Sequence, residues 1–255
     1  MSRESKLHGL FFLIGTLLLW ELVSRAGWVN PLIIPPVSKI FASFWSLLSS
    51  GQIPAQILVS LRRAATGYCL AAIVFIPLGV LMGLFDRLYR ALEVVVEMLR
   101  PIPPPVVIPV AMLFFGLEDQ MKVFVIFFSC AWPILLNTLD GVRNIDPLLL
   151  HTGKTFGLSQ GQIIWRVLLP ACSPQIMTGL RVSLPITLIL VVISEMVGST
   201  DGIGYFILDS QRRFRVAQMY AGMLSLALLG YALNRLFDLL QRKLLGWHWG
   251  QLQKG

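Results

Sequence analysis

Charged residues are scarce in this sequence. Asp, Glu, Lys and Arg make up 13% of the 255 residues, against about 25% in an average soluble domain, whereas hydrophobic residues make up 56%. The mean hydropathy is +0.74. A single water-soluble core of this size cannot bury so much apolar surface. The composition therefore excludes an ordinary soluble domain and predicts a membrane domain, for which one unit is enough at this length.

Cysteine and histidine are also rare. The three cysteines, Cys69, Cys130 and Cys172, form neither a C-x-x-C pair nor an even framework, which argues against disulfides and structural zinc. We expect all three to be small buried side chains. The three histidines stand far apart and lack the spacing of metal ligands, so we expect no metal site.

Catalytic and nucleotide-binding motifs are missing as well. No G-x-x-x-x-G-K-[ST] occurs, so the chain does not bind ATP through a P-loop. Neither G-x-S-x-G nor H-E-x-x-H occurs, and no set of polar groups forms a catalytic constellation. We therefore expect no enzyme activity and no bound cofactor, although a membrane-embedded enzyme is an alternative that polar groups clustered at one depth would favour.

The net charge of +8 comes from basic residues scattered between apolar runs. Such a distribution favours anionic lipid head groups as the counterpart of the charge, and it argues against nucleic acid. The excess of basic residues on one side of the expected membrane spans is small, so it orients the chain only weakly.

Hydrophobic runs predict an all-α, polytopic membrane protein with about six spans. An amphipathic helix near residues 38–48 is expected to lie on the membrane surface. The third span is predicted to be a broken helix, because a proline-rich stretch interrupts it and its second half is too short for a bilayer that needs ~20 residues. The expected spans are residues 10–23, 61–85, 92–117, 121–142, 176–197 and 216–240.

The segment from Asp146 to Pro170 lies between the fourth and fifth spans and is typical of two short helices. Asp146 can cap the first helix, with a proline in its first turn. Gly157 suits a left-handed residue that closes this helix. Ser159 and Gln162 have capping-box spacing for the second helix, which we expect to end at or just before Pro170.

This segment resembles a signature of the permease subunits of binding-protein-dependent ABC importers. The signature reads E-A-A, three residues, G, nine residues and I-x-L-P, in one cytoplasmic loop. Gly157 matches the glycine, and Val167, Leu169 and Pro170 match the closing triplet at the same spacing. Departures occur at the first three positions, where this chain has His151, Thr152 and Gly153.

The rest of the chain resembles the permeases for taurine, aliphatic sulfonates and nitrate. The stretches that carry this resemblance are WELVSRAGW, LRPIPPPVVIPVAMLFFGL, NTLDGVRNID and ISEMVGSTDGIGYFI. The resemblance implies a type I ABC importer permease, with one transmembrane domain over residues 1–255, a core at about 57–240 and a coupling loop at 144–170.

The resemblance also implies the partners and the location. The chain would sit in the cell inner membrane as a homodimer, with two ATP-binding subunits in the cytoplasm and a solute-binding protein outside. ATP would be bound by the partner subunit, and the solute would be a small anion that passes between the two permease chains. The residues expected to couple to the ATPase are Leu148, Leu149, His151, Thr152, Gly153, Phe156, Gly157, Val167, Leu169 and Pro170.

Prolines inside four successive spans indicate a second candidate region. Each removes a helical hydrogen bond, and in lipid the freed carbonyl must find another partner. Pro109, Pro133 and Pro185 are therefore candidates for a transport pathway, although proline is also simply common in membrane helices. Glu195 is either a gate or cavity residue, or a structural carboxylate that has a partner.

Arg212, Arg213 and Arg215 cluster in the loop before the last span. They could form an outer mouth that meets an acidic binding protein or attracts anions, or they could contact lipid phosphate. A stand-alone, ion-coupled secondary transporter is the alternative function. That class usually has inverted repeats and paired charges in mid-membrane, and neither is visible in this sequence.

Overall fold

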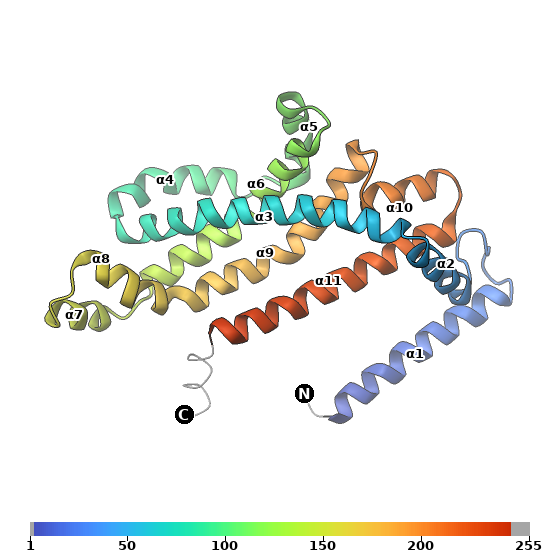
Figure 1. Ribbon diagram of the computed structural model, residues 1–255, viewed down its shortest axis with the longest axis horizontal. Helices are drawn as coiled ribbons and strands as arrows, with labels where there is room; N and C mark the ends of the chain where they lie inside the picture. Colours follow the sequence, from blue (N-terminus) through green and yellow to red (C-terminus); the bar gives the residue numbers. More distant parts are fainter. Residues whose placement is uncertain (1–2, 246–255) are drawn as a thin grey trace. The chain divides into compact units, whose positions relative to one another are not determined.

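The structure is a computed structural model that describes residues 3–245. The described part of the chain is built from helices, with no strand among its elements (Figure 1). The last histidine, His248, lies outside the described residues. The chain divides into two compact units, one from residues 1–60 and 200–229 and the other from residues 61–199 and 230–255.

The first unit contains α1 (Arg3–Arg25), α2 (Val37–Ser49), α10 (Ile203–Arg212), the start of α3 (Gln52–Leu84) and the first half of α11 (Val216–Leu244). The link after α1 is held to that helix, because the Ser24 hydroxyl donates to the Ile34 carbonyl at 2.7 Å. Trp20 of α1 contacts Tyr220 of α11 edge to face, with ring centroids 5.7 Å apart.

The second unit contains α4 (Asp86–Leu99), α5 (Pro104–Phe115), α6 (Asp119–Arg143), α7 (Pro147–Thr155), α8 (Gln160–Ile163) and α9 (Leu169–Gly198), with the remainders of α3 and α11. Helices α6 and α9 pack closely, because glycines lie at their contacts. A Cβ atom on Gly179 of α9 would lie 2.8 Å from the Pro133 carbonyl oxygen of α6. The close packing of α9 on α6 therefore requires a residue without a side chain at position 179.

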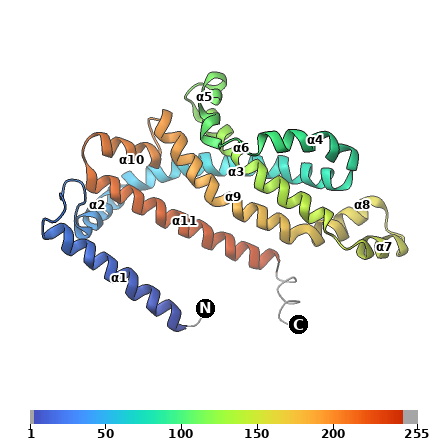
Figure 2. The ribbon, with the colours of Figure 1, turned by 180° about the vertical axis from the view of Figure 1, so that it is seen from behind.

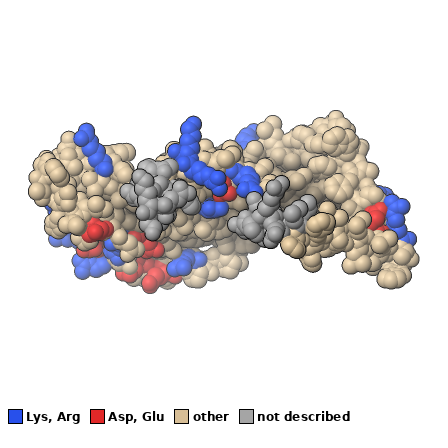
Figure 3. Space-filling view, turned by 90° about the horizontal axis from the view of Figure 1, so that it is seen from below, with Lys and Arg blue, Asp and Glu red and all other residues tan. Residues whose placement is uncertain are grey.

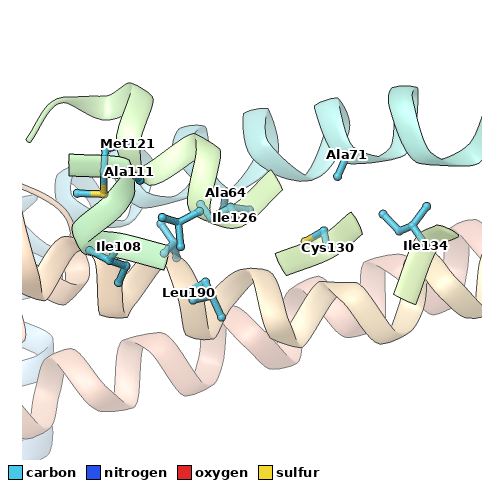
Figure 4. Close-up of a cluster of buried hydrophobic side chains, with 11 residues drawn as sticks. Ala64, Ala71, Ile108, Ala111, Met121, Ile126, Cys130, Ile134 and Leu190 are labelled. Atoms are coloured by element: carbon cyan, nitrogen blue, oxygen red, sulfur yellow. The ribbon is translucent and has the colours of Figure 1, made fainter. Parts of the chain in front are cut away.

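The main hydrophobic core of the second unit lies where α3, α5, α6 and α9 meet. Figure 4 shows the buried side chains, among them Ala64 from α3, Ile108 from α5, Ile126 from α6 and Leu190 from α9. Polar groups packed against it find hydrogen-bond partners on neighbouring helices. The Tyr68 hydroxyl, for example, donates to the Leu180 carbonyl oxygen at 2.9 Å.

Four helices of the described chain are long and apolar enough to cross a membrane: α3, α6, α8 with α9, and α11. Helices α4 and α5 make a fifth crossing if they are taken together, with a bend of 99° between them (Figures 1 and 2). The expected break in the third span is therefore confirmed. The face in Figure 3 has wide areas without charge, and its acidic and basic residues lie together in a few mixed clusters, as suits a multi-pass membrane protein.

The predicted positions of the prolines inside helices are confirmed, whereas the prediction for one cysteine is wrong. The prolines expected inside spans do lie inside helices, at Pro109 in α5, Pro133 in α6 and Pro185 in α9. Burial of all three cysteines was expected, but Cys69 is exposed. Position 69 is two residues from Gly67, which packs on α6, so its side chain leaves α3 on the opposite side.

Candidate functional site

The first helix of the 144–170 segment, α7, is capped at both ends as predicted. Its first turn is fixed by the Asp146 carboxylate, which accepts a hydrogen bond from the Leu148 amide at 2.8 Å. Its last turn closes at Gly157, whose φ is +73°. The Leu158 amide donates to the Gly153 carbonyl and the Gly157 amide to the Lys154 carbonyl, which is a Schellman motif.

Large apolar side chains of this segment face outward. Leu148, Leu149 and Phe156 are exposed, and Phe156 has 81% of its surface free. His151 and Thr152 are exposed as well. The candidate coupling residues on α7 therefore form a partly apolar surface on a short, rigid helix.

The same helix is held on its other side by the second short helix. Gly153 is buried, and a Cβ atom there would lie at ordinary contact distance from Ile163 and Val167, 3.5 and 3.6 Å away. Leu168 is buried beside Ile145. The two short helices therefore pack against each other.

The end of the second helix differs from the prediction. The capping box of Ser159 and Gln162 is present, but the helix does not stop at Pro170. A π-helical turn, Ile164–Leu168, leads from α8 directly into α9, and Leu169 and Pro170 form the first turn of α9. The wider turn accommodates the proline, whose ring would crowd the carbonyl four residues earlier in a regular α-helix.

A hollow of about 730 Å³ lies on one side of α6 and α9. Pro133 belongs to its wall, whereas Pro109 and Pro185 do not. Sequence reasoning missed its other members, because only the fold brings helix faces together. The lining residues are Arg100, Pro104, Ser129, Trp132, Pro133, Leu136, Asn137, Asp140, Ile186, Ile189 and Leu190.

Trp132 in this wall has an unusual hydrogen-bonding state. Its indole nitrogen is buried and has no hydrogen-bond partner in the part of the chain that the structure describes. Because a buried, unpaired N–H is costly, this donor is available to a group from outside the chain. Arg100 adds a positive charge and Asp140 a negative charge to the same hollow.

Glu195 does not line this hollow. It is fully buried, and its Oε1 accepts a hydrogen bond from Nη1 of Arg63 at 3.0 Å. Arg63, which is 4% exposed, also donates to Asp119 at the start of α6, with Nε 2.7 Å from Oδ1. Of the two readings of Glu195, the structure favours the carboxylate with a partner, which joins α9 to α3 and α6.

Arg212 is the last residue of α10, Arg213 and Arg215 follow it in the short link to α11, and all three side chains are exposed. Arg213 is paired with Asp209 at 2.9 Å. The start of α10 is fixed, because its Ile203 amide donates to the Ser60 hydroxyl at 2.8 Å. The three arginines therefore lie between the C-terminal end of an anchored helix and the start of α11.

The residue between these arginines, Phe214, adopts a left-handed conformation with φ +55°. Other left-handed residues in the described chain are glycines. A side chain in this region costs about 1–2 kcal/mol, because its Cβ crowds the following carbonyl oxygen. Phe214 is 89% exposed, so burial within the described chain does not offset this cost. Sequence reasoning missed Phe214, since an aromatic residue next to arginines gives no sign of its backbone conformation.

Comparison with known proteins gives the family. The family model described as "Binding-protein-dependent transport system inner membrane component" matches residues 75–245. SsuC of Bacillus subtilis (strain 168), named as an aliphatic sulfonates transport permease protein, is 31% identical over 96% of this chain and 89% of its own length. The bicarbonate transport system permease protein CmpB of Synechocystis sp. is also 31% identical, over 94% of this chain and 89% of its own length.

A solved structure of the MetNI methionine ABC transporter in inward-facing conformations shares the fold. The TM-score is 0.61 at 21% sequence identity, over 72% of this chain and 92% of the matched chain. The expected type I ABC importer permease fold is therefore confirmed. The chain belongs to the family of inner-membrane components of binding-protein-dependent transport systems, as a multi-pass permease subunit of an ABC importer.

Proposed function

We propose that the exposed face of α7 is the surface on which a cytoplasmic ATP-binding subunit docks. Leu148, Leu149 and Phe156 are exposed on a helix that is capped at both ends, so docking requires little ordering of the backbone. An apolar helix face of this kind fits a groove on a partner. ATP binding and hydrolysis belong to that partner, and this chain supplies no catalytic residue.

The observation that carries the proposal is the unbroken path from this surface to the hollow. The second short helix runs through the π-helical turn into α9 without a loop. Further along the same helix, Ile186, Ile189 and Leu190 form part of the wall of the hollow. A displacement of α7 and α8 is therefore transmitted to that wall by a helix rather than by a flexible link.

We propose that the hollow is this chain's share of the solute pathway, completed by a second copy of the chain. An open hollow along α6 and α9 can become a closed passage when a second surface of the same kind covers it. On this proposal the whole chain acts as one transmembrane domain, with its core at about 57–240. A solute-binding protein delivers the solute from outside.

The proposed solute is a small anion, such as an aliphatic sulfonate, taurine or nitrate. Two kinds of donor in the hollow support this choice: the Arg100 guanidinium and the buried Trp132 indole N–H. Both suit oxyanions, which accept several hydrogen bonds. The names of the two related permeases, which refer to aliphatic sulfonates and bicarbonate, point the same way.

Co-purification tests the docking surface. The partner is an ATP-binding subunit that co-purifies with the wild-type permease, and the variant is Leu149→Asp, which places a charge on the apolar face of α7. The matched control is Gln160→Glu, which adds the same charge to the same segment at the first residue of α8, where the helix dipole tolerates it.

We expect Leu149→Asp to be inserted and folded but to retain the ATPase at a level at least ten-fold lower, because an interface anchor contributes more than about 1.4 kcal/mol. The control should retain the wild-type level. Equal retention by both variants would refute docking on α7.

A further inference from the structure

Phe214, the strained aromatic residue between Arg213 and Arg215, is not explained by the proposed docking of an ATPase on α7. Phe214 occupies the C′ position of a Schellman motif at the end of α10. The Arg215 amide donates to the Ser210 carbonyl at 2.8 Å, and the Phe214 amide donates to the Gln211 carbonyl at 3.0 Å. Glycine is the usual residue at this position, because it has no Cβ to strain.

The chain uses glycine at the equivalent place elsewhere. Gly157 closes α7 with the same pair of hydrogen bonds, and Gly51 follows α2 with φ +77°. Phenylalanine at position 214 is thus less favourable for folding than the residue used at the other helix ends. The residue is 89% exposed, so packing within the described chain does not compensate for the strain.

The helix that precedes Phe214, α10, is held by its neighbours. The Gly202 amide donates to Gln56 Oε1 at 2.6 Å, which holds the start of α10 against α3. On the other side, Phe206 of α10 packs so closely on α11 that a Cβ atom on Gly222 would lie 3.1 Å from its ring. The helix therefore has contacts with α3 at its start and with α11 along its length, and Phe214 follows its C-terminal end.

The charges around the ring determine which surface it can meet. Arg213 is neutralised by Asp209, but Arg212 and Arg215 have no ion-pair partner within the described residues. An exposed aromatic ring flanked by unpaired arginines has the composition of an interface hot spot that faces an acidic surface. Aromatic side chains also serve at lipid head groups, but that role does not require one strained backbone position.

We propose that Phe214 is the anchor by which this permease binds its solute-binding protein, inserting into an apolar pocket with an acidic rim. Arg212 and Arg215 contact that rim. This inference rests on the proposed function, in which a binding protein delivers solute to this chain.

The experiment measures the affinity of a purified solute-binding protein from the source organism for the permease–ATPase assembly. The assembly is placed in nanodiscs of neutral lipid and, separately, in nanodiscs with added anionic lipid. The key variant is Phe214→Gly, which removes the ring and relieves the backbone strain, so folding is favoured rather than impaired. Trp28→Ala, at an exposed aromatic residue of the same unit, is the matched control.

We expect Phe214→Gly to raise the Kd for the binding protein about ten-fold or more in both lipids. Its melting temperature should equal or exceed that of the wild type, and Trp28→Ala should leave the Kd unchanged. A Kd within two-fold of the wild-type value overturns the proposal. A change seen only with anionic lipid assigns the ring to the membrane, and a dissociated permease dimer assigns it to the second copy.

The wild-type assembly separates this inference from the proposed function. If wild-type permease binds the protein and Phe214→Gly binds it equally well, only the anchor is refuted. If the wild-type permease binds no solute-binding protein at all, the importer function fails together with the anchor.

Discussion

Removal of Glu195 should destabilise the permease more than any nearby change of charge. This carboxylate is completely buried and is hydrogen-bonded to Arg63, whose side chain is 4% exposed. In Glu195→Ala the guanidinium stays buried and loses one of its partners. Asp119 remains beside it, but that carboxylate is 41% exposed and is shared with Arg62.

The magnitude follows from these burials. Breaking a buried ion pair by removing one member costs about 3–5 kcal/mol, and the remaining contact with Asp119 places Glu195→Ala near the lower end of this range. Glu195→Gln keeps the volume and an acceptor, so only the charge contribution of about 1.5–3 kcal/mol is lost. Asp119→Asn removes a carboxylate that water already screens, and we expect a cost of about 1 kcal/mol.

The assay is thermal unfolding of the purified permease–ATPase assembly in detergent. The melting temperature should fall in the order Asp119→Asn, Glu195→Gln, Glu195→Ala, from the smallest to the largest decrease. The control is Glu118→Ala, an exposed carboxylate next to Asp119, with an expected change within about 0.5 kcal/mol. If Glu195→Ala has the melting temperature of the wild type but has lost solute uptake, the structural role is refuted and Glu195 is a gate residue instead.

Two further predictions concern the packing of α6 on α9 and the solute. Gly179→Ala should lower the free energy of unfolding by about 1–3 kcal/mol, because the new methyl group would lie 2.8 Å from the Pro133 carbonyl oxygen. Gly153→Ala is the control, because its new methyl group would have contacts of 3.5 Å or more and should not destabilise the fold. Equal melting temperatures of the two variants would contradict this prediction. Arg100→Gln should slow the uptake of radiolabelled sulfonate into proteoliposomes about ten-fold or more, since a hydrogen bond to a charged group contributes about 1.5–3 kcal/mol. Arg100→Lys keeps the charge and should retain part of the activity. An unchanged uptake rate in Arg100→Gln would show that Arg100 does not contact the solute.

Local signals explain most of what the sequence predicted correctly. The Asp146 cap, the Ser159–Gln162 capping box and the left-handed Gly157 depend on residues at most a few positions apart. The break between α4 and α5 has an equally local cause in its prolines. Pro170 was predicted wrongly, because the π-helical turn that accommodates it has no clear sequence signature.

Long-range features could not be predicted in this way. Arg63 and Glu195 are 132 positions apart, and neither residue type identifies the other as its partner. The grouping of Arg100 and Trp132 around one hollow depends on how the bend before α5 places that helix against α6. The strain at Phe214 is a property of backbone geometry, which composition does not reveal.

The most direct test of the account is solute-stimulated ATP hydrolysis in liposomes that contain the permease, the ATPase and the solute-binding protein. The variant is Phe156→Asp, which charges the most exposed apolar side chain at the end of α7. If α7 transmits the movement of the ATPase to α9, solute should no longer stimulate ATP hydrolysis in this variant. In the wild type and in Gln160→Glu, solute should stimulate ATP hydrolysis fully. Stimulation of Phe156→Asp at the wild-type level would contradict the claim that this helix couples ATP hydrolysis to transport.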